Sequence, residues 1–285
     1  MYFKIQFVKR CVSMGKEYSA LEVKNLNFSI NSRVILNNIC LNIKSGKFCS
    51  IIGPNGSGKT TLLKNISTTY KPEVKKIYIN GKDAAILKVK ELGKHISYVK
   101  QGVDIEFDFI VRDIVLMGRI PHMKRLESER QSDIDIAEEA MKLTNILHLK
   151  DRNIRQLSGG EKQRVMIARA IAQEGNVLLL DEPTSHLDIY HQFEILDTVK
   201  KINKELNTTI VAVLHDLNLA AQYSDYIFIV NDGKLAAQGT PLEVLTEETL
   251  RNIYNVEIKI LKNSDRGIPY IIPVCKIDKP KGRYV

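Results

Sequence analysis

The chain has 285 residues, which is enough for one large domain or two modest ones with a sizeable apolar core. No apolar run approaches the roughly 18 residues of a membrane-spanning helix. The N-terminal segment also lacks the extended apolar region and the small-residue cleavage site of a secretory signal. The sequence therefore predicts no membrane-spanning helix and no secretory signal. We expect a cytosolic protein, whose role at a membrane would require a partner that supplies the spanning helices.

The net charge of +9 lies mainly at the two ends of the chain. Residues 1–24 carry +3 and residues 259–285 carry +5, which leaves +1 for everything between them. A nucleic-acid enzyme more often places its positive charge beside its active cleft, so we expect no nucleic-acid partner. Basic ends are more often solvated surfaces, and contact with an anionic lipid surface is the less common alternative.

The four cysteines are far apart and show no metal-ligand spacing. They are Cys11, Cys40, Cys49 and Cys275. This usage is typical of a reducing compartment, and we expect reduced, buried thiols.

The first third of the chain predicts several strands and one helix. Strand-like runs occupy residues 21–30, 34–43 and 48–53, and turn residues separate them. A helix is expected from Thr60 onward, because Leu62, Leu63 and Ile66 recur at helical spacing. Short strands are then expected at residues 76–80 and 96–100.

The remaining two thirds begin with a helical insert. Residues 110 to about 174 contain no convincing strand, and residues 111–117 and 134–147 predict amphipathic helices. Strand and helix alternate again over residues 177–230, which is typical of a parallel sheet covered by helices. A hairpin with its turn at Asp232-Gly233, short helices after Pro241 and small strands from about residue 257 complete the chain.

Residues 53–61 have the composition of a phosphate-binding loop between a buried strand and a helix. They are Gly53, Pro54, Asn55, Gly56, Ser57, Gly58, Lys59, Thr60 and Thr61. The glycines allow backbone N–H groups to point at an anion, and the helix adds the positive end of its dipole. Lys59 can reach the terminal phosphates, and the Thr60 hydroxyl can bind Mg²⁺. The alternative is a glycine-rich turn that happens to carry a lysine.

An apolar strand at residues 177–182 ends in two acids, Asp181 and Glu182. The end of a strand in an open α/β sheet lies at the ligand-binding edge. Asp181 can therefore hold Mg²⁺ through water, and Glu182 can act as the general base for an attacking water. The alternative is a buried strand that ends in solvated acids.

Ser158 and Glu161 form a capping box at the start of an apolar helix. Capping does not explain Gly159 and Gly160, because each glycine destabilises the first turn by about 1 kcal/mol relative to alanine. Glycines there expose N–H groups at a helix N-terminus and make a second anion site. A phosphate loop and a separate anion site in one chain suggest two copies that share nucleotides.

These motifs occur in the order seen in ATP-binding cassette proteins, and over residues 20 to 255 the chain resembles that family. Residues 53–60 resemble the family's Walker A loop, Gln101 its Q-loop, and residues 157–161 its signature motif. Residues 181–182 resemble its Walker B motif, residues 185–188 its D-loop, and His215 its switch histidine. The resemblance implies a P-loop NTPase parallel-sheet core with an antiparallel β subdomain and a helical insert. It also implies a head-to-tail homodimer that closes over two ATP molecules.

The resemblance further implies roles for single residues. Gln101 would contact the metal and the attacking water, His215 would contact the γ-phosphate, and Asp188 would belong to the nucleotide site. Without the family resemblance, Gln101 would be interpreted as a solvated glutamine. A lone histidine such as His215 is more often a packed core residue or a surface residue. The domain would span residues 21–255, with the helical subdomain at about 102–174. Residues 1–20 would be an N-terminal extension and residues 256–285 a basic tail.

One position departs from the family pattern. The family usually places an aromatic residue on the first strand, where it stacks against adenine, and that position corresponds to Ile30. Isoleucine can contact the base but lacks a π-face. Arg33 could cover the base through a cation–π type contact.

Within the family, three segments are similar to the ATPase subunits of importers for iron–siderophore complexes, haem and cobalamin. They are VLMGRIPH (residues 115–122), HLDIYHQFEIL and LHDLNLAAQYSD. This resemblance implies integral membrane permease subunits as partners, docked on Gln101 and the insert, and indirectly an extracytoplasmic substrate-binding protein. The chain would then lie at the cytoplasmic face of the membrane. The alternatives are an ATPase of another transporter class, a soluble cassette ATPase acting on ribosomes or DNA, and a nucleotide-dependent scaffold.

Overall fold

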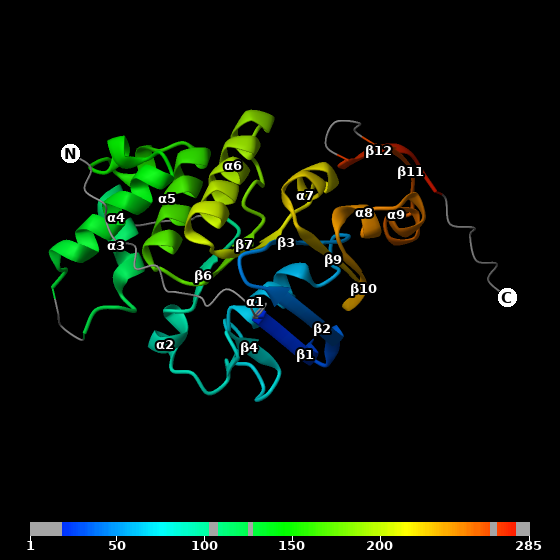
Figure 1. The fold of residues 1–285 in the computed structure, drawn as a ribbon, viewed down its shortest axis with the longest axis horizontal. Helices are drawn as coiled ribbons and strands as arrows, with labels where there is room; N and C mark the ends of the chain where they lie inside the picture. Colours follow the sequence, from blue (N-terminus) through cyan, green and yellow to red (C-terminus); the bar gives the residue numbers. More distant parts are fainter. Residues whose placement is uncertain (1–18, 103–107, 125–127, 263–266, 278–285) are drawn as a thin grey trace.

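The computed structural model describes residues 19–102, 108–124, 128–262 and 267–277 (Figure 1). The predicted N-terminal extension lies almost entirely outside the described residues, and so do Cys11 and the last eight residues of the predicted basic tail.

A six-stranded sheet forms the centre of the molecule, in the order β10-β9-β3-β8-β7-β6. Its strands are β3 (Phe48–Ile52), β6 (Ile96–Val99), β7 (Val177–Asp181), β8 (Thr209–Val213), β9 (Tyr226–Asn231) and β10 (Lys234–Gly239). All neighbours are parallel except β10, which pairs antiparallel with β9 at one edge. Every residue of β3, β7 and β8 is buried, which explains why these strands are continuous, mostly apolar runs in the sequence.

A second, antiparallel sheet has the order β2-β1-β4-β5. It consists of β1 (Ser19–Ile30), β2 (Arg33–Lys44), β4 (Ile77–Ile79) and β5 (Lys82–Asp83). Asn31 and Ser32, with φ of 48° and 63°, make the predicted turn between its two long strands. The parallel core and the antiparallel β subdomain of the expected fold class are therefore both present.

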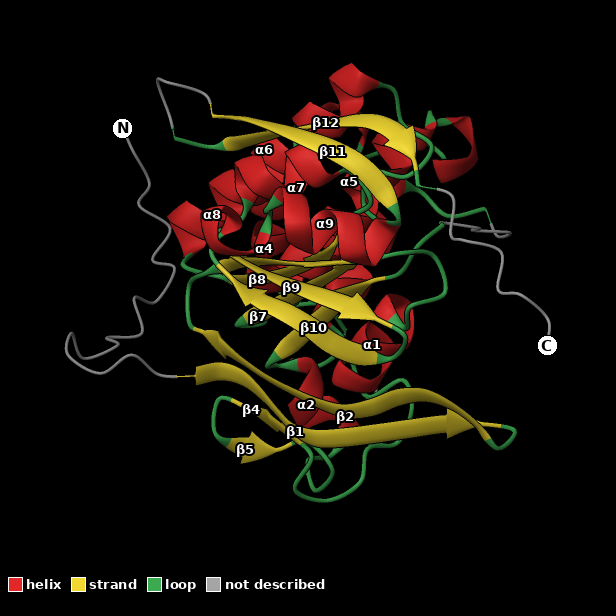
Figure 2. Cartoon of the chain, turned by 90° about the vertical axis from the view of Figure 1, so that its right-hand side faces the viewer, coloured by secondary structure: helices red, strands yellow, loops and turns green. Residues whose placement is uncertain are grey.

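The helices lie on both sides of the central sheet. They are α1 (Lys59–Ile66), α2 (Val89–Gly93), α3 (Val111–Leu116), α4 (Gln131–Leu143), α5 (Gly159–Ala172), α6 (Ile189–Leu206), α7 (Leu217–Tyr223), α8 (Pro241–Val244) and α9 (Glu247–Tyr254). Figure 2 shows the layers: the antiparallel sheet, then α1, the central sheet, α5 to α7, and a hairpin of β11 (Val256–Lys262) and β12 (Pro269–Lys276).

Alternate residues of the central strands belong to two separate apolar cores. Ile51 and Leu179 pack with α1 and the antiparallel sheet, whereas Ile52 and Leu180 pack with α5, α6 and α7. Period-two alternation therefore assigns each strand residue to one face of the sheet. The two cores clamp the sheet from both sides, and its strand ends are held in fixed positions.

The helical insert differs from the prediction in the bounds of its second helix. A helix was expected over residues 134–147, but α4 ends at Leu143 and begins at Gln131. The Thr144 hydroxyl donates back to the Ala140 carbonyl at 2.9 Å, and Asn145 follows with a left-handed φ of 55°. The chain therefore leaves the helix before the apolar period ends, and a separate 3₁₀ turn covers Leu147–Leu149.

The prediction of buried cysteines is right for Cys49 and wrong for Cys40 and Cys275, which are exposed. Burial, with the Asp225 carboxylate nearby, raises the pKa of the Cys49 thiol to about 12. Cys40 and Cys275 lie on the outer strands β2 and β12, whose alternate residues face solvent. Among the described residues, no helix combines the length and the apolar character needed to cross a membrane.

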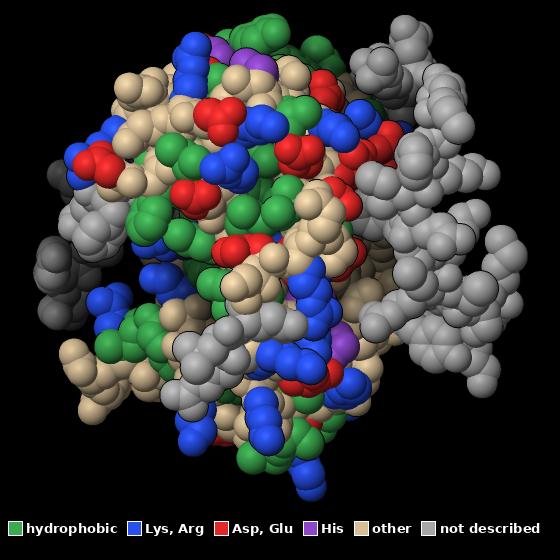
Figure 3. Space-filling view, turned by 90° about the vertical axis from the view of Figure 1, so that its left-hand side faces the viewer, with side chains coloured by type: hydrophobic (Ala, Val, Ile, Leu, Met, Phe, Trp, Pro, Cys, Tyr) green, Lys and Arg blue, Asp and Glu red, His purple; other side chains and the backbone are tan. Residues whose placement is uncertain are grey.

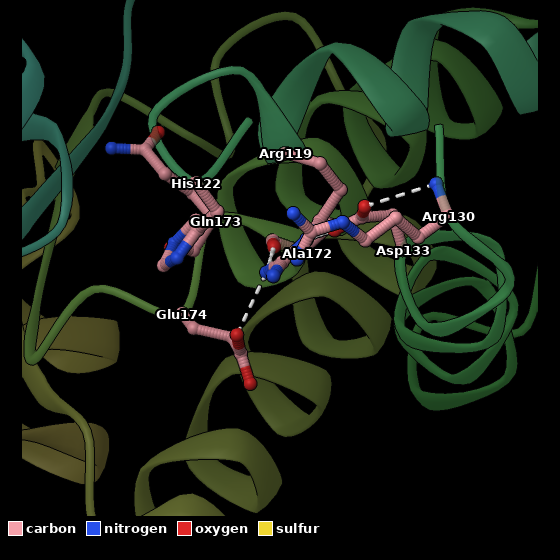
Figure 4. Close-up of polar contacts among 7 residues, drawn as sticks. All are labelled: Arg119, His122, Arg130, Asp133, Ala172, Gln173 and Glu174. Atoms are coloured by element: carbon pink, nitrogen blue, oxygen red, sulfur yellow. Dashed lines mark hydrogen bonds and ion pairs between the residues drawn. The ribbon is translucent and has the colours of Figure 1, made fainter. Parts of the chain in front are cut away.

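A buried arginine joins the helical insert to the end of α5 (Figure 4). Arg119 is only 4% exposed, and its guanidinium donates to Asp133 at 3.0 Å, to Glu174 at 2.8 Å and to the Ala172 carbonyl at 2.5 Å. His122 Nε2 donates to the neighbouring Gln173 carbonyl at 2.8 Å. The VLMGRIPH segment thus contains an internal polar anchor rather than an ordinary helix end.

We predict that Arg119→Met lowers the free energy of unfolding by about 3 kcal/mol, because it leaves the nearly buried Asp133 carboxylate without its cationic partner. Urea denaturation measures the change. Arg112→Met is the matched control: its ion pair with Asp151, at 3.5 Å, is exposed, so the loss should stay below about 1 kcal/mol. Equal losses in both variants would contradict the anchoring role of Arg119.

Candidate active site

The predicted phosphate loop connects β3 to α1 through three glycines with positive φ. Gly53, Gly56 and Gly58 have φ of 148°, 77° and 104°, values that residues with a side chain rarely adopt. A Cβ added to Gly53 would lie 2.0 Å from the Val230 carbonyl oxygen, so only glycine fits there. The loop geometry therefore requires the glycines that identified it in the sequence.

Lys59 holds its ammonium inside this loop. Its Nζ donates to the carbonyls of Gly53 and Pro54, both at 2.9 Å. Burial lowers the pKa of Lys59, and the carboxylates of Glu182 and Asp181 act in the opposite direction. The loop therefore contains a nearly buried amine directed at its own centre.

Two further features suit this loop to a phosphate group. The Ser57 hydroxyl is buried and has no hydrogen-bond partner among the described residues. Gly58, the N-cap of α1, has no side chain to cap the first turn, so the helix presents its N–H groups to the loop. A buried hydroxyl, an ammonium and a helix N-terminus together supply several hydrogen-bond donors, which match the acceptor oxygens of a phosphate.

Asp181 ends β7 beside the loop and is 1% exposed. Its carboxylate accepts hydrogen bonds from the Thr60 hydroxyl and the Tyr98 hydroxyl, both at 3.1 Å. Burial raises the pKa of Asp181, and these two hydrogen bonds lower it. Burial, with Asp181 beside it, also raises the pKa of Tyr98. The predicted pair of Thr60 and Asp181 is thus brought into direct contact.

The donor set at this point suits Mg²⁺. Thr60, Asp181 and Gln101 offer hydroxyl, carboxylate and amide oxygens, which are the hard ligands that this ion prefers. Within the described ranges, no group of three or more His, Cys, Asp or Glu side chains could hold a metal by itself. Mg²⁺ characteristically uses one or two protein ligands together with water and substrate phosphates, and these few oxygens fit that pattern.

Glu182 directly follows Asp181 and is held by three side chains. Its two carboxylate oxygens contact Gln101 Nε2 at 2.5 Å, Ser185 Oγ at 2.9 Å and His215 Nε2 at 2.5 Å. The backbone at Glu182 is left-handed, with φ of 50°, a conformation that costs on the order of 1 kcal/mol for a residue with a side chain. Strain of this kind occurs at functional sites, where the surrounding structure maintains it.

These residues line one open cleft of 450 Å³. The lining consists of Asn55 from the phosphate loop, Gln101 after β6, His215 after β8, and Glu182, Ser185 and His186 after β7. Each of these residues follows the carboxyl end of a parallel strand. The strands β3, β8, β7 and β6 are neighbours in the sheet, so the segments after them lie side by side. The structure therefore brings together the predicted phosphate-loop, metal and catalytic residues.

The second predicted anion element lies at the start of α5. Ser158 and Glu161 form the predicted capping box: the Ser158 N–H donates to the Glu161 carboxylate at 2.7 Å, and the Glu161 N–H donates to the Ser158 hydroxyl at 3.3 Å. The first of these bonds lowers the pKa of Glu161. Space is open beside Gly159, and Ser158 and Gly159 are exposed. This element faces solvent instead of the cleft.

Gly160 lies close to the predicted D-loop through His191. A Cβ on Gly160 would lie 3.3 Å from the His191 ring, and His191 Nδ1 contacts the Asp188 carboxylate at 2.8 Å. The hydrogen bonds from His191, its backbone N–H first, lower the pKa of Asp188, which is the N-cap of α6. Asp188 is therefore linked through His191 to the first turn of α5.

Ile30 and Arg33 face each other across the turn between β1 and β2. Ile30 is 41% exposed, and Arg33 is exposed. Farther along β2, Leu36 and the Ile35 carbonyl contact Gly58 of the phosphate loop. The turn therefore belongs to the strand pair that borders the loop, and the base contact of Ile30 and Arg33 stays a prediction.

A family model described as "ABC transporter" matches residues 36–185, which is more than half of the chain. The chain is also 35% identical to the ferric enterobactin transport ATP-binding protein FepC of Escherichia coli, over 92% of this chain and 96% of that protein. The chain belongs to the ABC transporter family. It is one of the family's ATP-binding, ATP-hydrolysing subunits.

Two solved structures of the family have the same fold. A metal-chelate type ABC transporter in an inward-facing conformation matches with a TM-score of 0.79 and 28% identity, over 90% of this chain and 98% of that one. The ATP-binding cassette MJ0796, in a dimeric post-hydrolysis state bound to ADP and Pi, matches with a TM-score of 0.66 and 31% identity, over 77% and 98%. The ABC ATPase fold expected from the sequence is thereby confirmed.

Three residues of this ABC ATPase site were not selected from the sequence. Tyr98 contacts Asp181, Ser185 contacts Glu182, and His186 lines the cleft. Ser185 and His186 lie inside the D-loop stretch, of which only Asp188 was chosen. The signal for Tyr98 is weaker: its hydroxyl is a polar group near the end of a strand that leads to Gln101.

The preference for ATP over GTP tests the effect of having Ile30 where the family usually has an aromatic residue. We predict that Ile30→Tyr raises the preference for ATP over GTP, because tyrosine adds the aromatic face that the wild type lacks. The measurement is the ratio of kcat/KM for ATP and GTP hydrolysis. Val34→Tyr, at an exposed position on β2, is the control. An equally strong ATP preference in the wild type and in Ile30→Tyr would show that stacking at residue 30 is not needed.

Proposed function

We propose that this ABC ATPase powers an importer of iron chelates of the siderophore type. The observation that carries the catalytic part is the environment of Glu182, a carboxylate at the mouth of a phosphate loop that is held by Gln101, Ser185 and His215. A nucleotide-dependent scaffold has no need for a carboxylate oriented in this way.

ATP binds with its phosphates in the loop of residues 53–61. Lys59 exchanges its carbonyl partners for phosphate oxygens, and Ser57 gains the acceptor that it lacks among the described residues. Thr60, Asp181 and Gln101 are the residues that would hold Mg²⁺, which supplies neutralisation of phosphate charge when bound. Ile30 and Arg33 lie where they can contact the base.

Glu182 then acts as the general base. Its carboxylate accepts a proton from a water molecule while the water oxygen forms a bond to the terminal phosphorus. The bond from that phosphorus to the bridging oxygen breaks, which yields ADP and inorganic phosphate. Gln101 and His215 hold the two carboxylate oxygens of Glu182 and can also contact the water and the γ-phosphate.

A second copy of the chain completes each site. Ser158 and Gly159 face solvent, so they are available to a γ-phosphate bound in the loop of another copy, whereas Gly160 behind them is buried. Asp188 is linked to the first turn of α5 through His191. The relative MJ0796 is dimeric with ADP and Pi, which supports this arrangement.

Glu182→Gln should bind ATP and form a lasting dimer, because the amide keeps the size of the side chain but cannot accept the proton. Turnover should fall by a factor of about 10² or more. Size-exclusion chromatography with and without ATP and Mg²⁺, together with a phosphate-release assay, measures both effects. Ser158→Arg in the same background should abolish the dimer and leave ATP bound to the monomer.

The control for this pair is Glu139→Gln on α4, which removes a carboxylate paired only at the surface with Lys142. It should behave as the wild type in both assays. A Glu182→Gln protein that remains monomeric with saturating ATP, or that still turns over normally, would contradict the shared-site mechanism.

Coupling to transport requires membrane partners. The relatives are a ferric enterobactin transport protein and a metal-chelate type transporter, and they support permease subunits as the partners of this chain. We place the contact on Gln101 and the insert, residues 102–156, at the cytoplasmic face of the membrane. On the insert side of the molecule, acidic, basic and hydrophobic side chains are intermingled (Figure 3). An extracytoplasmic binding protein would deliver the substrate.

The substrate class can be tested by transport. The chain is reconstituted into proteoliposomes with its co-purified permease, and ATP-dependent uptake of a ferric siderophore, haem and cobalamin is compared. We expect uptake of the ferric chelate, with none in Glu182→Gln. Uptake of haem or cobalamin alone would reassign the substrate, and movement in the opposite direction would overturn import.

A further inference from the structure

The C-terminal hairpin of β11 and β12 belongs to the main apolar core. Ile258 and Ile271 are 3% and 2% exposed and lie in the same cluster as α5, α6 and α7. The hairpin lies over α7 and α9, at the edge of the molecule away from the antiparallel sheet (Figure 2). The segment beyond residue 255, predicted as a basic tail, is thus partly a core element.

Asn218 fastens this hairpin to α7 by two hydrogen bonds. The Ile271 N–H donates to Asn218 Oδ1 at 2.7 Å, and Asn218 Nδ2 donates to the Ile271 carbonyl at 3.1 Å. The asparagine amide pairs with the Ile271 backbone as a neighbouring strand would. The Asn218 side chain thus offers both a donor and an acceptor, and so does the Ile271 backbone. This two-way pairing makes the contact specific for an amide side chain.

The same residue lies in the first turn of the helix that begins directly after His215. Asp216 is the N-cap of α7, and its carboxylate accepts the N–H groups of Asn218 at 2.7 Å and Leu219 at 3.0 Å. His215 precedes this cap and is 43% exposed, so little packing restrains its side chain. The buried Leu214, whose N–H donates to the Ile51 carbonyl at 3.2 Å, and the α7 N-terminus therefore fix the His215 backbone from its two sides.

We propose that Asn218 is a positioning residue that holds His215 against Glu182 by anchoring α7 to β12. The inference rests on the proposed function, because it assigns Asn218 an effect that acts through His215. Displacement of a catalytic group by about 1 Å can lower the rate about 10²-fold, so loss of this anchor can affect turnover without affecting nucleotide binding.

A double-mutant cycle tests the proposal. Asn218→Ala, His215→Ala and the double variant of the full chain are compared for kcat of ATP hydrolysis, Kd for ATP and melting temperature. We expect Asn218→Ala to lower kcat about tenfold, an effect typical of a misplaced catalytic group, with Kd nearly unchanged. In the His215→Ala background the same substitution should have no further effect on kcat, because the two residues act as one unit.

Two further variants control for misfolding and for effects on kcat that do not depend on the contact between Asn218 and Ile271. Asn218→Asp keeps the shape and the acceptor for the Ile271 N–H but loses the donor, so it should fold and should lower kcat only when His215 is present. Asn252→Ala makes the same chemical change at an exposed position on α9, and its kcat should match the wild type.

The outcomes separate the two proposals. An equal loss of kcat from Asn218→Ala in both backgrounds, or no loss in either, would overturn the positioning role while leaving the proposed function intact. Full activity of His215→Ala alone would overturn the role given to His215 in the proposed function, and the role of Asn218 with it. A rise in Kd for ATP with unchanged kcat would also contradict the inference.

Discussion

The parallel pairing of β3, β8, β7 and β6 is the constraint on which the site depends. Parallel strands end at the same edge of a sheet, so the loops after these four strands converge. The phosphate loop, His215, Asp181 with Glu182, and Gln101 each follow one of them. Residues that are far apart in the sequence are adjacent because of this register. The two apolar cores hold the sheet from both faces, so the ends of its strands are fixed relative to one another.

Much of this arrangement could be predicted from the sequence, because the strands that carry it are buried on both faces. Such strands appear as continuous apolar runs, and a polar residue at the end of each run is conspicuous. The phosphate loop could also be predicted from its glycines, because the positive φ and the close approach of the Val230 carbonyl at Gly53 exclude every other residue type. The capping box of Ser158 and Glu161 is a local pattern and was predicted for the same reason.

Contacts between distant segments were not predictable in this way. Asn218 and Ile271 are 53 positions apart, and nothing local to either residue indicates the other. Nothing local to Arg119 indicates its buried ion pair with Asp133 or its ion pair with Glu174. The end of α4 was misplaced because the apolar period continues past Leu143, whereas the backbone turns at Asn145. Each of these features depends on tertiary packing, which periodicity does not encode.

The pairing of Lys59 with the carbonyls of Gly53 and Pro54 has a consequence for the end of each catalytic cycle. When the products leave, the ammonium does not have to remain unsolvated in a nearly buried loop, because it returns to acceptors in its own chain. The departing anion is thereby replaced by internal dipoles, and the energetic penalty for emptying the loop becomes smaller. The same carbonyls compete with each incoming phosphate for the Lys59 ammonium, which weakens the binding of the nucleotide and favours its exchange.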